Sequence, residues 1–119
     1  MPQFRVVHYE TPAGRDVIEE FLDNLPEADR DACDVVIDYL ETGELESHPR
    51  NSAFIGDGIW ELCIARGGRQ FRFLYGTDGG TAYIVTAFIK KTPQAPKAQL
   101  DKARQRFAEL KEEECGHEP

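Results

Sequence analysis

Apolar and polar residues recur with two different periods along this chain. In residues 17–25, apolar side chains return every three or four positions among acidic ones, which predicts an amphipathic helix that starts near Thr11-Pro12. Pro26 opens a second helix of the same kind, and Gly43 stands where a C-terminal cap belongs. A last helix is expected from about Pro96. Its apolar stripe consists of Leu100, Ala103, Phe107 and Leu110.

The remaining regular segments show the two-residue period of strands. A short strand is expected at residues 3–9, and residues 59–91 predict three strands joined by two glycine-marked turns, the first at Gly67-Gly68. Residues 44–58 show no strong period and are expected to form a connection. The order β-α-α-β-β-β-α predicts one α+β domain over residues 1–119, with an antiparallel meander packed on an N-terminal helix pair and a C-terminal helix.

Strand alternation sorts the meander into two faces. The first set is almost wholly apolar and is expected to pack on the helix pair, because burying one such side chain stabilises the fold by about 1.5–3 kcal/mol. Its members are Trp60, Leu62, Ile64, Phe71, Phe73, Tyr75, Tyr83, Val85, Ala87 and Ile89. The second set is partly polar: Glu61, Cys63, Ala65, Gln70, Arg72, Leu74, Thr86, Phe88 and Lys90. The pattern fits two interpretations of this second face equally well. The face is either a functional site or a half-exposed surface that is partly covered by the last helix.

Composition narrows the class of protein. A chain of 119 residues suits one domain with a modest core. No apolar run approaches the roughly 20 residues of a membrane span, and the first residues lack the pattern of a signal peptide. The three cysteines, Cys33, Cys63 and Cys115, are odd in number and form no CxxC pair. We therefore expect a reduced, cytoplasmic protein without a membrane partner.

Charge is unevenly distributed. The net charge of −8 by itself argues against a nucleic-acid partner. Residues 1–58 hold 4 bases and 14 acids, whereas residues 59–97 hold 6 bases and 2 acids. This basic segment is either a binding patch or only the ordinary decoration of strands beside acidic helices. Lys90 and Lys91 close the last strand, and lysines on a rigid strand end can be aimed at a phosphate.

Several motifs then point to one family. The segments "GIWELCIA", "RQFRFLYG" and "FIKKTPQAP", with the later Ala103-Arg104, resemble the RelE/HigB superfamily of toxins, and within it the phage-derived Gp49-like (HigB-like) group. The resemblance covers nearly the whole chain and implies a RelE-like fold. It implies the toxin of a type II toxin–antitoxin system, a metal-independent endoribonuclease without a cofactor that cuts mRNA on the ribosome. A helix-turn-helix antitoxin is the implied inhibitor, and the oligomeric state stays open.

The resemblance also implies roles for particular residues. Cleavage by a ribose 2′-hydroxyl needs a proton acceptor, a proton donor and positive charge on the attacked phosphate. Arg72 and Lys90 would hold that phosphate, and Tyr75 would donate a proton if the strand turns it outward, since alternation puts it on the core face. From the residues themselves, Glu61 is expected to pair with Arg72 across the strands.

The implied RNA-binding residues are Arg66 and Lys91, which would dock the backbone, and Phe88, which would stack on a base. The chain departs from the family pattern at Cys63, where relatives commonly carry arginine, and at Thr86, where they often carry histidine. The candidate face therefore has one fixed charge and one proton-transfer group fewer. Two other hypotheses remain: a non-catalytic relative that keeps a protein-binding groove, and a gyrase-directed relative of the ParE kind, which ranks last.

Overall fold

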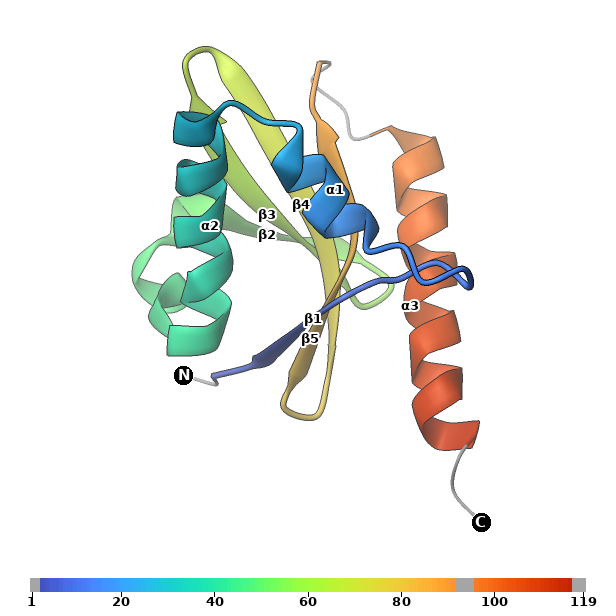
Figure 1. The fold of residues 1–119 in the computed structure, drawn as a ribbon. Coiled ribbons are helices and arrows are strands. Elements are labelled where there is room, and N and C mark those ends of the chain that lie inside the picture. The colour runs from blue at the N-terminus through green and yellow to red at the C-terminus, as the bar shows by residue number, and fades with distance from the viewer. Residues whose placement is uncertain (1–2, 92–95, 117–119) are drawn as a thin grey trace.

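The computed structural model describes residues 3–91 and 96–116, with side chains up to residue 112. Within these residues one five-stranded sheet has the order β1-β5-β4-β3-β2, and Figure 1 shows it between α2 and α3. Only β1 and β5 are parallel; the other pairs are antiparallel. The strands are β1 (Arg5–His8), β2 (Ser52–Gly56), β3 (Ile59–Arg66), β4 (Arg69–Asp78) and β5 (Thr81–Ile89). The helices are α1 (Val17–Asp23), α2 (Glu27–Thr42) and α3 (Lys97–Gly116), with 3-10 turns η1 (Glu44–Ser47) and η2 (Pro49–Asn51).

The α+β class, the helix pair, the meander and the C-terminal helix are confirmed, but the predicted start of α1 near Pro12 is wrong. The segment after β1 makes a turn, in which the Gly14 amide donates to the Thr11 carbonyl and Gly14 has φ +88°. Asp16 caps the helix instead, because its carboxylate accepts from the amides of Ile18 and Glu19. At the end of α2, Gly43 takes the predicted left-handed cap with φ +82°.

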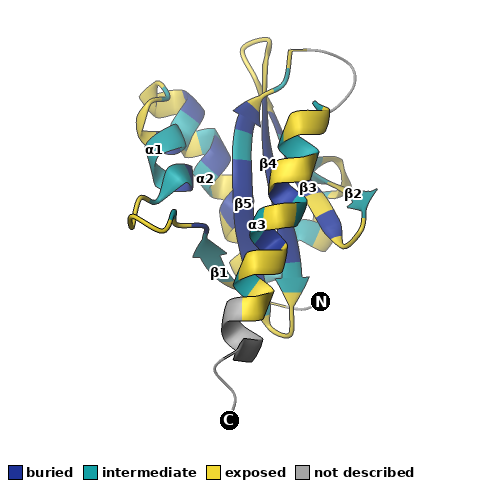
Figure 2. Ribbon diagram, turned by 90° about the vertical axis from the view of Figure 1, so that its right-hand side faces the viewer, coloured by how far each residue is buried: buried dark blue, intermediate teal, exposed yellow. Residues whose placement is uncertain are grey.

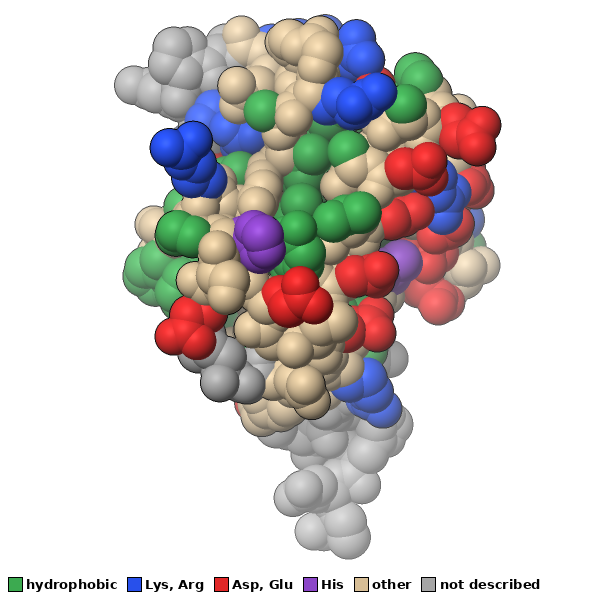
Figure 3. All heavy atoms as spheres, turned by 90° about the vertical axis from the view of Figure 1, so that its left-hand side faces the viewer, with side chains coloured by type: hydrophobic (Ala, Val, Ile, Leu, Met, Phe, Trp, Pro, Cys, Tyr) green, Lys and Arg blue, Asp and Glu red, His purple; other side chains and the backbone are tan. Residues whose placement is uncertain are grey.

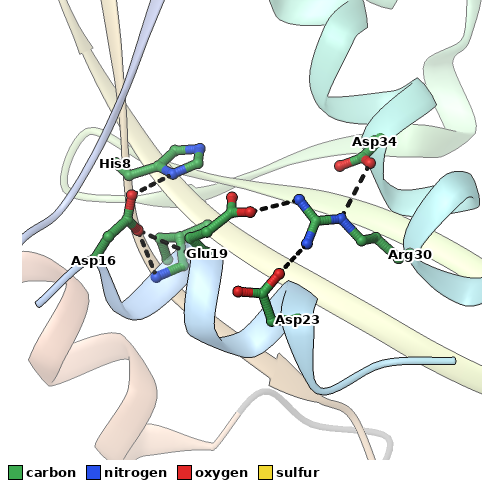
Figure 4. Close-up of polar contacts among 7 residues, drawn as sticks. His8, Asp16, Glu19, Asp23, Arg30 and Asp34 are labelled. Carbon is green, nitrogen blue, oxygen red and sulfur yellow. Dashed lines mark hydrogen bonds and ion pairs between the residues drawn. The ribbon is translucent and has the colours of Figure 1, made fainter. Parts of the chain in front are cut away.

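One arginine pairs with three acids between the first two helices. Figure 4 shows the Arg30 guanidinium among carboxylates of Glu19 and Asp23 from α1 and Asp34 from α2. The Nη2–Oε1 distance to Glu19 is 2.6 Å, and Asp23 contacts Nη1. These acids raise the pKa of Arg30, with the Glu19 hydrogen bond as the largest cause. Part of the acidic surface of the N-terminal half is therefore structural and joins α1 to α2.

The two faces of the sheet carry separate cores. The helix-pair face buries Leu62, Phe71 and Phe73 against α1 and α2. The opposite face, which we call the α3 face, buries Leu74, Tyr83, Val85 and Phe88 with Ala103 and Phe107 of α3. Figure 2 shows α3 lying across this face, with buried residues turned to the sheet and exposed ones to solvent.

Strict alternation mispredicted part of the apolar set. The pairing of β4 with β5 shifts between Leu74 and Tyr75, so Tyr83 and Val85 turn to the α3 face instead of the helix-pair face. Trp60 and Ile89, expected in the core, remain 38% and 39% exposed near the sheet margins. A β-bulge reverses the face toward which the side chains beyond it point. A strict two-residue period does not predict this reversal.

The connection predicted at residues 44–58 contains an element that the pattern did not reveal. It forms η1, η2 and the edge strand β2, which pairs with β3 alone. Because β2 lies at the edge of the sheet, its residues do not alternate between buried and exposed, and Ala53 and Phe54 are both exposed. The two-residue apolar pattern that identifies a strand is therefore missing. The Gly67-Gly68 hairpin is confirmed, with φ +58° and +77°. Residues 92–95 of the "FIKKTPQAP" motif lie outside the described residues, as does the Cys115 side chain. No helix of the described chain is long and apolar enough to cross a membrane.

Phe107 and Arg104 are two of the residues that hold the C-terminal helix to the sheet and its β2–β3 turn. The Phe107 ring lies directly over Gly76 of β4, where an added Cβ would meet ring carbons at 2.5–2.6 Å. Beside it, Arg104 Nε lies 2.9 Å from Asp57 Oδ2 in the β2–β3 turn. Glycine at position 76 is thus required by close approach of the ring, and not by a positive φ.

We predict that Gly76→Ala lowers the free energy of unfolding by about 1–3 kcal/mol, because the methyl group and the Phe107 ring need the same space. Phe107→Ala should cost about 3–5 kcal/mol by leaving a cavity. Urea denaturation measures both. Gly80→Ala is the matched control, since nothing lies within 4 Å of its Cβ. Equal stability of Gly76→Ala and Gly80→Ala would disprove the contact.

Candidate functional site

Arg72 is the centre of the polar group on the α3 face. Its guanidinium is only about one-tenth exposed and is held from several sides. Nη2 donates to Gln70 Oε1 at 2.6 Å, and Nη1 donates to the Phe71 carbonyl at 3.3 Å. Nε lies 3.4 Å from Glu61 Oε1, which is an ion-pair distance without hydrogen-bond geometry. The predicted Glu61–Arg72 pair is therefore confirmed.

This buried pair is incompletely satisfied. Within the part of the chain that the structure describes, both Arg72 Nε and Glu61 Oε2 are buried without a hydrogen-bond partner. An unsatisfied buried polar atom costs about 1–3 kcal/mol, and more where the group is charged. Since structural cores avoid such atoms, the pair has the character of a site that retains polar groups at the expense of stability.

Lys90 lies beside Arg72 on the same face. Its backbone amide donates to the Gln70 carbonyl at 2.8 Å, which places it across the strands from the residue that holds Arg72. Diagonal cross-strand neighbours lie about 7–8 Å apart, within reach of side chains as long as these two. Lys90 is half-buried and Lys91 is exposed, and neither forms an ion pair with the described residues. The strand end thus presents ammonium groups that are open to an anion.

Cys63 faces Arg72 directly in the β3–β4 register. Its thiol donates to Glu61 Oε1 at 3.4 Å. Burial, followed by the charge of Glu61, raises the pKa of Cys63 to about 11, although the charges of Arg72 and Lys90 act in the opposite direction. The thiol therefore stays protonated at neutral pH and is a poor nucleophile.

Two arginines near the β3–β4 turn are committed to α2. Asp29 is 2% exposed, and its carboxylate accepts from Arg69 Nε and Nη2 at 2.9 and 3.0 Å. Arg66 Nε lies 3.3 Å from Asp29 Oδ1. Both arginines stay about half exposed. Arg66, implied as an RNA-docking residue, is thus present at this end of the sheet, but its charge is shared with a buried acid.

The structure places the other two implied residues away from open solvent. Tyr75 is 3% exposed on the helix-pair face, where its hydroxyl lies 3.2 Å from Ser52 Oγ, and burial raises its pKa. It faces away from Arg72, so the outward turn that a proton donor needs is not present. Phe88 shares the face of Arg72 but is 7% exposed beneath α3. Arg72, Lys90 and Glu61 are brought together; Tyr75 and Phe88 do not join them at the surface.

The surface separates the two signs of charge. Figure 3 shows Lys and Arg side chains mainly toward the end of the molecule where the β3–β4 turn lies, and Asp and Glu mainly lower and toward the right of the view. We call the first region the basic end; by strand register its members are Arg66, Arg69, Arg72, Lys90 and Lys91. The net charge of the protein therefore understates the positive field at this end.

The site contains contacts that sequence analysis missed. Gln70 orients Arg72. Asp29 holds Arg69, which lies 40 positions further along the sequence, and it also holds Arg66. Gln70 carried a usable signal, because it lies two residues from Arg72 on the same face of one strand. Asp29 carried no such signal, because one aspartate among several on an acidic helix is expected to be exposed to solvent. Among the described residues, no group of three or more His, Cys, Asp or Glu is placed to hold a metal.

These features define a class of protein. An α+β domain with an antiparallel meander between a helix pair and a C-terminal helix is compatible with a RelE-like fold. The chain belongs to the phage derived protein Gp49-like (DUF891) family, whose model matches residues 20–108. That range extends from α1 through the whole meander into α3 and includes the Arg72 site. No curated protein matches the chain.

We predict slow alkylation of Cys63. With a pKa of about 11, roughly one thiol in a thousand is ionised at pH 8, and the reaction rate should rise about tenfold per pH unit toward pH 10. Iodoacetamide labelling followed by peptide mass spectrometry isolates this residue from the other cysteines. Glu61→Gln should speed the reaction, because it removes a carboxylate that raises the pKa of Cys63. Labelling at pH 7 as fast as in the urea-unfolded chain would contradict the prediction.

We also predict that Asp29→Asn lowers the free energy of unfolding by about 1–3 kcal/mol, since it removes the charge that pairs with two arginines. Asp31→Asn, an exposed change on the same helix, should stay within about 0.5 kcal/mol of the parent. Urea melts at low and high salt make the comparison. If the two variants unfold alike, Asp29 does not join α2 to the hairpin.

Proposed function

We propose that this protein is a toxin of the RelE/HigB kind, the toxin component of a type II toxin–antitoxin pair that acts on mRNA at the ribosome in the cytoplasm. Its Gp49-like family and fold support this class. The observation that supports action on RNA is the group formed by Arg72, Gln70 and Lys90 at the basic end of the sheet. A helix-turn-helix antitoxin is the proposed inhibitory partner.

The proposed reaction is attack of a ribose 2′-oxygen on the adjacent phosphorus, which forms a 2′,3′-cyclic phosphate and releases the 5′-oxygen of the next nucleotide. The 2′-hydroxyl loses its proton to water, and water protonates the leaving 5′-oxygen. The crowded phosphate gains negative charge in the transition state, and fixed cations stabilise that charge. Lys90 is the accessible cation and makes the first contact. Arg72 lies behind it, and a bound phosphate would replace Glu61 as the partner of the guanidinium. Lys91 and Arg66 flank the path of the RNA backbone.

The proposed site differs from the one implied by the family resemblance. Tyr75 and Phe88 have no role in it, because Tyr75 lies on the other face and Phe88 is covered by α3. Glu61 acts as a positioning residue for Arg72. The site stabilises charge with two cations, and its proton-transfer groups are reduced by the presence of Cys63 where relatives carry arginine and of Thr86 where they carry histidine. We therefore expect slower cleavage than in relatives with both groups.

We predict that Lys90→Gln lowers ribosome-dependent mRNA cleavage about a hundredfold, because one preorganised cation on the phosphate is lost. Primer extension on mRNA in a reconstituted translation reaction measures cleavage, and induction in a bacterial host measures growth arrest. Arg72→Lys, which keeps the charge but loses the planar fork, should show a similar loss without unfolding.

Lys111→Gln is the matched control, since it removes the same charge from an exposed position of α3 outside the site. Circular dichroism melts confirm that each variant is folded. Intact mRNA with the folded parent protein would overturn the nuclease proposal. Full growth arrest by Lys90→Gln would do the same and would favour the second candidate.

The second candidate is a non-catalytic protein-binding module of the same fold. A specific observation favours it: Phe54 and Trp60 form an edge-to-face pair, with ring centroids 4.9 Å apart, at the open edge of the sheet, and are 57% and 38% exposed. Exposed aromatic residues beside an unpaired strand edge suit a partner segment that adds to the sheet. The near-complete burial of Arg72 fits this candidate as well.

A further inference from the structure

A polar cleft separates α1 from α3 beside β5. It lies toward the β1 edge of the sheet, away from Cys63 on β3. β1 pairs only with Thr81–Ile84, so the edge of β5 from residue 85 onward has no strand neighbour there in the described chain. The cleft lies along this edge and has a volume of about 410 Å³, within the range of small-ligand sites. α3 contributes Gln99, Lys102 and Arg106 to its lining, α1 contributes Glu20, and the preceding turn contributes Arg15.

The charge of this cleft is opposite to that of the protein. Arg15, Lys102 and Arg106 line it against the single acid Glu20, whereas the chain as a whole carries −8. The neighbouring clefts differ: the one beside Asp57 pairs two bases with two acids, and the one beside β1 has glutamates and a histidine but neither lysine nor arginine. Of these clefts, the one between α1 and α3 alone has a cationic excess.

The cations of the cleft are positioned to different degrees. Arg15 is held by Glu20 through two bonds of 2.9 and 2.6 Å. Arg106 donates to the Val85 carbonyl at 2.8 Å and lies 4.5 Å from the centre of the Tyr9 ring, so its position is fixed by the sheet. Lys102 is exposed and forms no ion pair with the described residues. Two fixed guanidinium groups and one free ammonium thus surround the same space.

A buried hydroxyl lies at the cleft. Thr86 lines it, is 1% exposed, and its Oγ1 has no hydrogen-bond partner among the described residues. Valine has nearly the same shape and would avoid this cost, so the unpaired hydroxyl indicates a ligand atom that completes its bonding. Thr86 pairs with Leu74, so it shares the face of Arg72 as a diagonal cross-strand neighbour, as strand alternation predicts. It also lines this cleft, on the α1 side of α3.

We infer that this cleft binds a phosphate group of a small ligand, with the size of a mononucleotide as its upper range. Lys102 and Arg106 supply charge, the Gln99 amide supplies neutral donors, and the Thr86 hydroxyl supplies a donor at the floor. Phosphate can come from a free nucleotide or from an RNA backbone, and the chemistry of the site is the same for both. The inference uses neither Arg72 nor Lys90, so it stands apart from the proposed nuclease activity.

The test titrates the full chain with inorganic phosphate, with a cytidine monophosphate and with a short single-stranded RNA, at constant ionic strength. Amide chemical shifts and thermal melts report binding. We expect shifts at Lys102, Arg106 and Thr86, and tighter binding of the nucleotide or the RNA than of phosphate alone. Preference for the nucleotide would identify a metabolite site, and preference for the RNA would identify an extension of the RNA path; both support the inference.

Lys102→Gln and Thr86→Val should each weaken phosphate binding about tenfold, the loss expected for one hydrogen bond to a charged group. Thr86→Val should also leave the thermal midpoint of the free protein unchanged or higher, which separates lost binding from lost folding. Lys111→Gln has the same net charge as Lys102→Gln and should bind like the parent. No saturable binding of any probe would overturn the inference. Equal weakening by Lys102→Gln and Lys111→Gln, or unchanged binding by both cleft variants, would do so as well.

Discussion

The close approach of the Phe107 ring to the backbone of Gly76 determines how the outer side of this protein is organised. It allows α3 to lie on the α3 face of the sheet, where Tyr83 and Phe88 complete a second core. A helix held in this way divides the polar residues of that face. The Arg72 site lies toward β3 and the cationic cleft lies toward α1, so the helix stands between two separate cationic sites.

Electrostatics explains how an acidic protein can carry cationic sites. Acids of α1 and α2 are partly used inside the fold, where Arg30 joins the two helices and Asp29 holds the β3–β4 hairpin. On the side of the molecule drawn in Figure 3, most of the other acids lie away from the lysines and arginines of the basic end. Because screening limits the reach of surface charge to about 10 Å at 0.1 M salt, an anion near Lys90 responds to local cations more than to net charge.

The burial of Arg72 connects the two candidate functions. A guanidinium already paired with Glu61 contributes to catalysis only when substrate exchanges with that carboxylate, and this exchange has an energetic cost. A toxin that binds RNA through Lys90 first can meet this cost with binding energy from the rest of the substrate. A protein-binding module would instead keep the Arg72–Glu61 pair closed and use the exposed edge at Phe54 and Trp60.

Local patterns determined the elements of this protein, whereas tertiary contacts decided its sites. Helical spacing, Gly43 and Gly67-Gly68 were enough to predict α2, the hairpin and the α+β class, because each depends on neighbours in sequence. Cross-strand proximity was enough to predict the Glu61–Arg72 pair. The bulge opposite Leu74 and Tyr75, by contrast, reversed the faces of Tyr83 and Val85, and the edge strand β2 left no alternation to detect. Only the folded chain decided that Arg72 is buried, that Tyr75 faces away from it and that Thr86 opens to a cleft, because burial depends on what packs above a residue and no local period encodes that.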